Sequence, residues 1–547
     1  MSEKAGTGIK VWIPLLFAVV LIAGMLIGFK LRDSLRNKRD ITTIIQRNDR
    51  LEQIIDLINA RYVDSVNTNL LYEDAVNGII RHLDPHTIYI PADKLQSVNE
   101  ELDGSFFGIG VEFSIVNDTI QITSVVEDGP AEMAGIQIGD KLVKVGDSIV
   151  AGNGITSTRI IKMLKGKQFS RVFLTMMDPL RDEIRVVSLK RDAIPKYSIE
   201  AGVMLDSLTG IIKITRFSAT TYDEFTEVLA SLKKQGMRKL IVDLRQNSGG
   251  YMEPAKQIAD EFLSGDKLIV MTKGTNSTVR KYIAGNTGGF EEGELVILVD
   301  EQSASASEIL AGAVQDWDRG VVIGRRTYGK GLVQDQFDLE DGSALRLTIA
   351  KYYTPSGRSV QRSFEKGREA YNRDFMMRYE NGELTGFDTL GNDDTTRYYT
   401  ANKRVVYGGG GINPDIYVPY DTSKLSTSLL NLIFSDNVKA VVWDYYIQNR
   451  TALRSYKTIK EFDKTFRADT LVQNYLNNQD RATKKTVEQM LKKDRYRSFF
   501  ALQMKAQLAR MLFRDNGYYS ISYKDDNVVA KALEILRDSS YSTIIGR

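Results

Sequence analysis

Short apolar runs alternate with helical patterns in the middle of the chain, and this alternation limits the fold more than any other feature. The apolar runs occupy residues 211–215, 240–244, 268–271, 295–299 and 321–324. Apolar spacing between them predicts helices at residues 222–235, 254–263 and 306–315. Strands that alternate with helices of this length indicate an α/β architecture.

The regions on either side of this alternation have other patterns of apolar and polar residues. Helical spacing predicts a helix at residues 42–61 and a second at residues 72–82, which the Asp84-Pro85 pair ends, because proline disfavours helical backbone at the preceding residue. Short strands and turns follow from residue 104. Residues 361–402 are polar and poorly periodic, and we expect a long, mobile surface insertion there.

The first residues predict a membrane segment. Residues 11–29 form 19 consecutive residues without charge, long enough to cross a bilayer as a helix. A cleaved signal peptide is the alternative, but the apolar stretch is long and no clean A-x-A site follows. We favour an uncleaved anchor. The basic residues after it favour a cytoplasmic C-terminal side, although large domains translocate largely regardless of charge.

The C-terminal segment is basic and helical. Residues 421–547 hold 22 Lys/Arg against 14 Asp/Glu, a net charge of +8, so the rest of the chain carries −5. Helical spacing recurs at residues 428–434, 470–478, 484–493, 499–513 and 528–538. Such a bundle could bind nucleic acid or anionic lipid, but charges of this kind more often form a solvated face. We expect it to pack on the core or to form a dimer.

Two scarce residue types restrict the chemistry. The chain has no cysteine, which excludes disulfides, thiolate metal sites and cysteine nucleophiles. It has two histidines, His82 and His86, so a Ser-His-Asp triad could use this one stretch alone. A histidine-rich metal site is excluded, and Pro85 interrupts the helix that would pair these two histidines on a metal. We therefore expect chemistry without histidine, metal or cofactor.

A glycine-flanked loop, Gly108-Ile109-Gly110, precedes a predicted strand. Backbone N–H groups of such a loop can converge on an anion, and the strand after it offers an edge for an added peptide strand. A tight turn is the simpler interpretation of the loop alone. The stretch 103–191, with FFGIGVEF and VVEDGPAEMAGIQIGDKLVKVGD, resembles a PDZ domain. The resemblance implies that Phe107, Gly108, Ile109 and Gly110 bind a terminal carboxylate.

Three segments follow predicted strands and carry candidate catalytic groups. Residues 243–250 (DLRQNSGG) end in paired glycines, which can aim N–H groups at a ligand or simply form a turn. Residues 301–312 (EQSASASEILAG) place serines at a helix start, where the dipole favours negative charge. Ser305 and Glu308 could equally be an N-cap and its capping-box partner. Residues 327–334 (TYGKGLVQ) carry a glycine-flanked lysine, and burial of Lys330 would make its neutral amine a general base.

Together these segments resemble the S41 family of carboxyl-terminal processing proteases, also called tail-specific proteases. The similarity runs from about residue 62 to residue 420 and includes LDPHT (83–87), DGSALRLTIAKYYTPSGRSVQ (341–361) and GGGGINPDI (408–416). It implies a ClpP/crotonase-like α/β core with an inserted PDZ domain that can block the site at rest. One departure is Ser248, where the family usually has proline.

The resemblance also implies the roles of the site residues. Ser305 is the nucleophile, Lys330 the general base, and Gln334, one helical turn or so further on, orients the lysine. Backbone N–H groups of Gly249 or Gly250 and of Ala306 form the oxyanion hole. Ser231 and Lys234 match an S-x-x-K motif, but they lie on an exposed amphipathic helix without S-D-N or K-T-G companions.

These observations predict a membrane-anchored serine endopeptidase with its catalytic body outside the cytoplasm, on the periplasmic side of a bacterial inner membrane. Its partners are proteins or peptides with free C-terminal tails, and an adaptor and a homo-oligomer through the C-terminal helices are further expectations; nucleic acid is not expected. A catalytically inactive PDZ scaffold and a crotonase-like acyl-CoA enzyme are the alternatives. The expected domains are an anchor or signal at 1–31, a helical region at 32–102, the PDZ-like domain at 103–191, the protease core at 192–420 and a helical domain at 421–547.

Overall fold

The computed structural model describes residues 50–116, 118–178, 181, 183–386, 396–422, 426–538 and 540–546. The membrane segment expected at residues 11–29 lies outside these residues. None of the helices within them is long and apolar enough to cross a bilayer. The chain divides into two compact units, residues 1–82 and residues 83–547.

The described part of the first unit is a pair of helices, α2 (Arg50–Arg61) and α3 (Thr68–Ile80). Asn67 ends the connecting loop, and its side chain accepts the N–H groups of Asn69 and Leu70 at the start of α3. This is the usual way in which asparagine caps a helix. Helix α3 therefore begins four residues earlier than the apolar spacing predicted.

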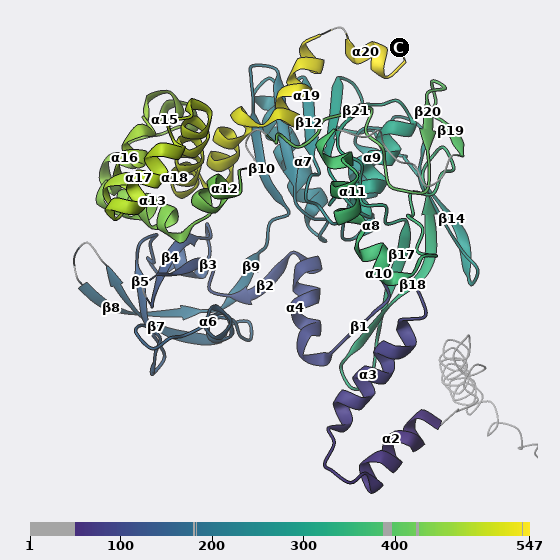
Figure 1. Ribbon diagram of the computed structural model, residues 1–547, viewed down its shortest axis with the longest axis horizontal. Helices are drawn as coiled ribbons and strands as arrows, with labels where there is room; N and C mark the ends of the chain where they lie inside the picture. Colours follow the sequence, from purple (N-terminus) through teal and green to yellow (C-terminus); the bar gives the residue numbers. More distant parts are fainter. Residues whose placement is uncertain are drawn as a thin grey trace, which may run out of the picture. The chain divides into compact units, whose positions relative to one another are not determined.

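A six-stranded sheet forms the centre of the second unit (Figure 1). Its strands, in spatial order, are β10 (Ile199–Met204), β11 (Thr209–Ile214), β12 (Lys239–Asp243), β15 (Glu294–Val299), β16 (Val321–Gly324) and β21 (Ile416–Tyr417). The β10–β11 pair is antiparallel and the other pairs are parallel. The α/β architecture expected from the alternating pattern is confirmed.

Both faces of this sheet are buried, as is usual for parallel strands. Along β12, Leu240 and Val242 pack on one side with helices α7 (Thr221–Lys234), α8 (Met252–Asp260) and α9 (Ala306–Asp316). Ile241, between them, packs on the other side with α19 (Asn527–Arg537) and α20 (Ser540–Ile544). The last helices of the chain thus complete the α/β core, although the sequence grouped them with the preceding basic helices.

The remaining C-terminal helices form a bundle around a hydrophobic core of their own. They are α12 (Thr427–Ile433), α13 (Asp436–Gln448), α14 (Arg450–Leu453), α15 (Ile459–Thr465), α16 (Asp469–Asn477), α17 (Arg481–Met490) and α18 (Asp494–Ser522). Non-helical backbone at Phe513 and Arg514 interrupts α18, and the short helix η2 (Tyr523–Asp525) links it to α19.

A second, five-stranded sheet lies beside the core helices. It consists of β1 (Ile88–Ile90), β13 (Leu268–Gly274), β14 (Ser277–Ile283), β17 (Leu332–Asp338) and β18 (Ala344–Tyr353). The apolar run at residues 268–271 therefore belongs to this antiparallel sheet and not to the central one. The register of β17 shifts between Val333 and Gln334, where the strand has a bulge or irregularity.

Residues 92–195 contain the PDZ-like region. Helix α4 (Ala92–Asp103) leads to β2 (Ser105–Gly108), which pairs with β9 (Asp192–Pro195). The sheet between them has the strands β3 (Val111–Val116), β4 (Thr119–Val125), β5 (Lys141–Val145), β6 (Ser148–Ile149), β7 (Arg171–Asp178) and β8 (Glu183–Lys190), with helices α5 (Pro130–Met133) and α6 (Ser157–Leu164). Among the described strands, β3 pairs with β4 alone and lies at the sheet edge.

The segment 361–402 differs from the surface loop that its polarity suggested. Its described part folds into α10 (Gly367–Asn372), α11 (Asp374–Glu380), the short helix η1 (Glu383–Thr385) and strand β19 (Arg397–Tyr399), which pairs with β20 (Val405–Tyr407). Tyr371, Arg378 and Glu383 are buried. Apolar periodicity does not detect this burial, because ion pairs rather than apolar contacts hold two of the three side chains.

Candidate active site

Three loops follow the carboxyl ends of adjacent parallel strands. Strand β12 ends at Asp243, β15 at Val299 and β16 at Gly324, and their pairings are β12 with β15 and β15 with β16. The carboxyl ends of adjacent parallel strands lie at the same edge of a sheet, where ligand sites of α/β proteins usually form. The three candidate catalytic segments of the sequence therefore meet at one edge.

Ser305 lies directly before α9 in an unusual backbone conformation, with φ 54° and ψ −112°. Such a conformation costs free energy for a residue with a side chain and is common at functional sites. It resembles the sharp strand-to-helix turn that exposes a nucleophilic serine in hydrolases. Ser305 and Glu308 also form a capping box. The helix start expected in this segment is therefore observed, with Ser305 as its N-cap.

The Glu308 carboxylate joins the serine turn to the lysine loop. Its Oε2 accepts the backbone N–H groups of Ser305 (2.9 Å) and Lys330 (2.8 Å). Its Oε1 accepts the Gly329 N–H (2.7 Å) and the Thr327 hydroxyl (2.5 Å). Since one oxygen bonds both, the backbone nitrogens of Ser305 and Lys330 lie less than about 6 Å apart. The carboxyl is fully buried, and burial raises the pKa of Glu308 while the four hydrogen bonds oppose that change.

Lys330 is largely enclosed, and burial lowers the pKa of its amine below the usual value. The Arg346 guanidinium lowers it further, whereas Asp84 and Glu308 act in the opposite direction. Lys330 Nζ donates a hydrogen bond to Gln334 Oε1 at 2.8 Å. Behind this loop, the buried Tyr352 hydroxyl lies 2.8 Å from the Lys330 carbonyl oxygen and 3.1 Å from that of Ser305. A hydrogen bond between Ser305 Oγ and Lys330 Nζ is absent from the described residues.

Gln334 contacts Lys330 from a strand and not from the expected helical turn. It lies on strand β17, just after the register shift at Val333. A bulge of this kind re-aims a side chain, which brings the amide back towards the loop. Gln334 Nε2 donates to the backbone carbonyl of His86 at 2.6 Å. The sequence placed neither histidine near the candidate catalytic residues, but the main-chain carbonyl of His86 contacts Gln334.

The paired glycines pack against the serine turn. A Cβ on Gly249 would lie 2.8 Å from Ser305 Cβ and 3.1 Å from Ala306 N, so a side chain would collide with the turn. The Gly249 N–H donates to Asn247 Oδ1 at 2.9 Å. The N–H groups of Gly250 and Ala306 have no partner among the described residues. Of the three expected oxyanion donors, Gly249 is therefore occupied and Gly250 and Ala306 are free.

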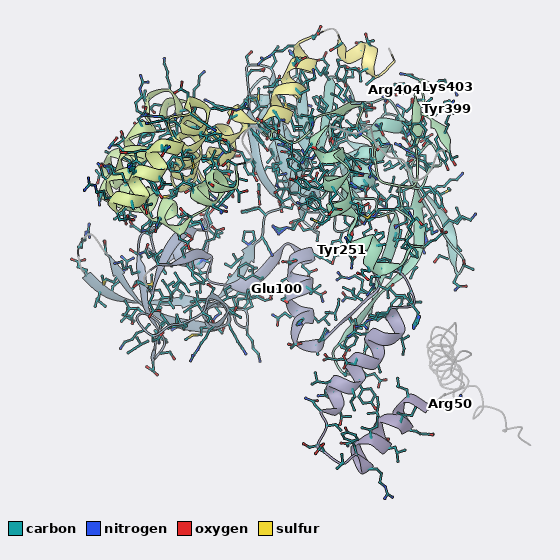
Figure 2. All side chains as sticks on the ribbon, viewed as in Figure 1. Arg50, Glu100, Tyr251, Tyr399, Lys403 and Arg404 are labelled. Atoms are coloured by element: carbon teal, nitrogen blue, oxygen red, sulfur yellow. The ribbon has the colours of Figure 1, made fainter. Side chains whose placement is uncertain are left out.

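The residue after this loop, Tyr251, is labelled in Figure 2. Its hydroxyl donates to Asp103 Oδ1 at 3.3 Å, at the end of α4. The loop that follows β12 thus contacts the segment that leads into the PDZ-like region.

The expected carboxylate loop of the PDZ-like region begins inside a strand. Phe107 and Gly108 are the last residues of β2 and pair with β9, so Ile109 and Gly110 alone form the turn. Gly110 has a φ of 78°, which suits glycine. The carbonyl groups of Ile109 and Gly110 accept the N–H groups of Ala131 and Val126, both at 2.9 Å. These bonds fix the turn beside the open edge of β3.

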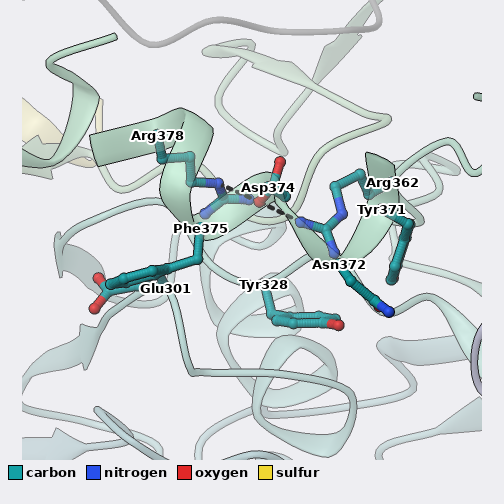
Figure 3. A pocket seen from close by; sticks show the side chains of 8 residues that line it. All are labelled: Glu301, Tyr328, Arg362, Tyr371, Asn372, Asp374, Phe375 and Arg378. Atoms are coloured by element: carbon teal, nitrogen blue, oxygen red, sulfur yellow. Dashed lines mark ion pairs between the residues drawn. The ribbon is translucent and has the colours of Figure 1, made fainter. Parts of the chain in front are cut away.

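A small pocket lies next to the lysine loop (Figure 3). It is lined by Glu301, Tyr328, Arg362, Tyr371, Asn372, Asp374, Phe375 and Arg378. Asp374 lies between the guanidinium groups of Arg362 and Arg378 and pairs with both. The S-x-x-K pair lies elsewhere, since Ser231 and Lys234 are both exposed on α7.

The first prediction concerns Glu308→Gln. A carboxylate accepts four hydrogen bonds, but an amide presents NH₂ at one end, so at least two of the four donors lose their acceptor. We expect the free energy of unfolding to fall by roughly 2–4 kcal/mol. Denaturant titration measures the change, with the exposed surface residue Glu488 changed to Gln as the control. A Glu308→Gln protein as stable as the Glu488→Gln protein would contradict this role.

Comparison with known proteins finds family matches for three stretches of the chain. Residues 208–366 match peptidase family S41, residues 96–176 match the PDZ domain, and residues 429–515 match a family of unknown function. The probable CtpA-like serine protease of Staphylococcus aureus (strain MRSA252) is 32% identical over 314 residues, which are 57% of this chain and 62% of that protein. A probable CtpA-like serine protease of Staphylococcus epidermidis (strain ATCC 12228) is 32% identical over 313 residues, with the same coverage.

Solved structures give more distant similarities. The photosystem II D1 C-terminal processing protease is 26% identical, with 57% of this chain and 89% of that chain covered and a TM-score of 0.32. The PDZ domain of a Vibrio cholerae carboxy-terminal protease, solved in complex with a peptide, is 28% identical; it covers 16% of this chain and 97% of its own, with a TM-score of 0.16.

The chain spans about three fifths of the length of the staphylococcal relatives that it matches. The PDZ match precedes the S41 match, and the S41 match contains Ser305 and Lys330. The chain therefore contains a region at residues 208–366 that matches peptidase family S41, and ahead of it a region at residues 96–176 that matches a PDZ domain.

Proposed function

We propose that this protein is a serine endopeptidase of the carboxyl-terminal processing type, with a Ser305–Lys330 dyad. The observation that carries the proposal is the fixed approach of a strained serine turn to a buried lysine, both held by the Glu308 carboxylate. A lysine whose pKa is lowered by burial can act as a general base near neutral pH, in place of histidine.

In the proposed reaction, Ser305 Oγ attacks the scissile carbonyl carbon while its proton passes to the neutral amine of Lys330. The bond from Oγ to carbon forms, and the carbonyl oxygen becomes an oxyanion. The N–H groups of Gly250 and Ala306 would donate to that oxyanion. Catalytic hydrogen bonds are often long before substrate binds, so the absent Oγ–Nζ bond is compatible with this step.

Collapse of the tetrahedral intermediate breaks the carbon–nitrogen bond, and Lys330 returns its proton to the leaving amine. An acyl-enzyme on Ser305 remains. Water then attacks the ester carbon, with Lys330 again as base, and the acid product leaves with Ser305 regenerated. Gln334 Oε1 accepts one N–H of the amine throughout, which leaves the nitrogen lone pair for Ser305.

The PDZ domain would select the substrate by its C-terminal tail. The edge of β3 can pair with an extended peptide, and the turn at Ile109 and Gly110 would receive the terminal carboxylate. Val111, Phe113 and Ile115 are partly exposed apolar residues of β3. They could contact the side chains of such a peptide.

The cellular setting is part of the same proposal. Residues 11–29 would anchor the protein in a membrane, and the catalytic body would lie on the periplasmic side of a bacterial inner membrane. An adaptor and a homo-oligomer through the C-terminal helices remain further proposals. Fractionation of cells with the full chain, with protease accessibility of the body from the periplasm, tests the anchor and its orientation.

The second prediction tests the dyad. Ser305→Ala and Lys330→Ala should each lower the rate of cleavage of a tail-bearing protein substrate by a factor of roughly 10³ or more, because each removes one half of the activated nucleophile. Fragments are quantified by mass spectrometry. Ser231→Ala and Lys234→Ala, which change the exposed S-x-x-K pair, are the matched controls and should retain activity. Full activity of either dyad variant would refute the assignment.

The third prediction tests recognition of the tail. Two peptides that differ in C-terminal amidation alone should be cleaved at different rates, with the free acid preferred by roughly tenfold, because the amide lacks the charge that the Ile109-Gly110 turn would bind. Competition for cleavage between the two peptides measures the preference. Equal rates would remove carboxylate capture from the proposal, and tail binding without cleavage by the wild type would favour a scaffold.

The fourth prediction is a pH dependence. The Arg346 charge disfavours protonated Lys330, so Arg346→Gln should raise the pKa of Lys330. Since the neutral amine is the active form, the acid limb of kcat/KM should move to higher pH. A series of kcat/KM values across pH measures the shift, and Lys351→Gln, a change of an exposed residue of β18, serves as the control. An unmoved acid limb, or one at lower pH, would contradict Lys330 as the base.

A further inference from the structure

Helix α10 of the segment 361–402 contacts the loop that supplies the acceptor for Gln334. That loop is residues 83–87, ahead of β1. The hydroxyl of Tyr371 on α10 lies 2.8 Å from His86 Nε2. The rings of the two residues pack edge to face, with their centroids 5.3 Å apart. Arg368 of α10 donates from Nη2 to the Asp84 carbonyl at 2.9 Å. Two side chains of one short helix therefore hold both ends of the Asp84–His86 turn.

The turn itself is closed by the Asp84 carboxylate. Asp84 Oδ1 accepts the N–H groups of His86 (2.8 Å) and Thr87 (3.0 Å), and Oδ2 accepts the Thr87 hydroxyl (2.6 Å). Thr87 is fully buried. This local network shapes the turn, but its position relative to β17 depends on groups from elsewhere in the fold. Tyr371 and Arg368 are such groups.

The His86 carbonyl decides which way the Gln334 amide faces. A carbonyl oxygen accepts hydrogen bonds and cannot donate them, so it bonds the NH₂ end of the amide. Oε1 is then left for Lys330 Nζ. If the carbonyl moved away, the amide could turn over and present NH₂ to the lysine. The neutral amine would then accept a hydrogen bond from the Gln334 NH₂ group, and its lone pair would no longer be available for the serine proton.

Tyr371 is in turn held by its surroundings. The Arg362 guanidinium lies over its ring at 3.9 Å, and over the ring of Tyr328 at 4.7 Å. Figure 3 shows Arg362, Tyr371 and Tyr328 at the same pocket. The path from α10 to the dyad therefore runs from Tyr371 to the His86 ring, from the His86 carbonyl to Gln334, and from Gln334 to Lys330.

We propose that Tyr371 and Arg368 are positioning residues for the catalytic lysine: they fix the His86 carbonyl, which sets the orientation of the Gln334 amide. The proposal rests on the proposed endopeptidase function. It assigns a role to a segment whose sequence indicated a surface insertion. Neither side chain touches the reacting atoms, so both act through Gln334.

The charges around Lys330 determine the expected pH signature. Arg346 faces it from β18, Asp84 from the 83–87 turn and Glu308 from α9, and none of these charges changes when Tyr371 becomes Phe. His86 lies beside this group, and burial together with Lys330 lowers its pKa to about 4, so it is neutral near pH 7. An acceptor at Nζ stabilises protonated lysine more than the neutral amine. A turned amide would therefore lower the pKa of Lys330.

The fifth prediction compares Tyr371→Phe with Tyr379→Phe, an exposed tyrosine of the neighbouring helix α11. Tyr371→Phe keeps the ring and removes the hydroxyl. We expect kcat to fall roughly three- to tenfold, the range for loss of one hydrogen bond, with KM within about twofold of wild type. The acid limb of kcat/KM should move to lower pH. Tyr379→Phe should match the wild type in all three quantities.

Arg368→Gln, with the exposed Arg373→Gln as its control, should lower kcat in the same way; because it also removes a positive charge near His86, the acid limb is compared for Tyr371→Phe alone. The variants are compared at temperatures where denaturant titration shows them folded. An unchanged kcat, or a lower kcat with an unmoved acid limb, would overturn the positioning role. A wild-type chain that cleaves no tail-bearing substrate would instead refute the proposed function.

Discussion

The buried Glu308 carboxylate is the interaction on which the site depends. It lies in the first turn of α9 and accepts four hydrogen bonds, one from the serine turn and three from residues 327–330. A buried charge without partners would be costly, so the four donors are what makes a carboxylate tolerable at this place. Burial of the carboxylate and approach of the two loops therefore require each other. The capping box of one helix serves at the same time as the clamp between the Ser305 turn and the Lys330 loop.

The rest of the fold supplies the rigidity that this clamp needs. Both faces of the central sheet are packed, with α7, α8 and α9 on one side and α19 and α20 on the other. The C-terminal segment also reaches the loop after β12. Arg245 pairs with Asp526 at the start of α19 (2.8 Å), and the Tyr523 hydroxyl donates to Asp243 at 3.1 Å. Lys213 and Arg245 lower the pKa of the fully buried Asp243 by their charges, against the effect of burial. The last helices thus stabilise the loop that carries Gly249 and Gly250.

Local patterns in the sequence predicted what depends on neighbours along the chain. The alternation of apolar runs and helices gave the α/β core, and the spacing of Ser305 and Glu308 gave the helix start. Contacts over long separations were not accessible in this way. The bonds from Glu308 to Gly329 and Lys330 cross more than 20 positions, and the bond from Gln334 to His86 crosses 248. The Gln334 position was expected one helical turn after Lys330, and a strand with a register shift at Val333 produces the contact instead.

The segment 361–402 shows why a polar sequence can still be part of a core. Periodicity detects apolar faces, but here three of the buried side chains, those of Arg362, Arg378 and Glu383, are charged. Arg378 is 2% exposed, and burial, followed by the charge of Arg326, lowers its pKa to about 10. Its Nη1 donates to the carbonyl groups of Arg326 (3.0 Å) and Thr327 (2.9 Å), while Arg326 pairs with Glu383. These bonds hold the main chain just ahead of Lys330, where the Thr327 hydroxyl also donates to Glu308. The lysine loop is therefore fixed by a carboxylate that accepts its N–H groups and by a guanidinium that donates to its carbonyl groups. In turn, the loop supplies the hydrogen-bond partners that each buried charge requires.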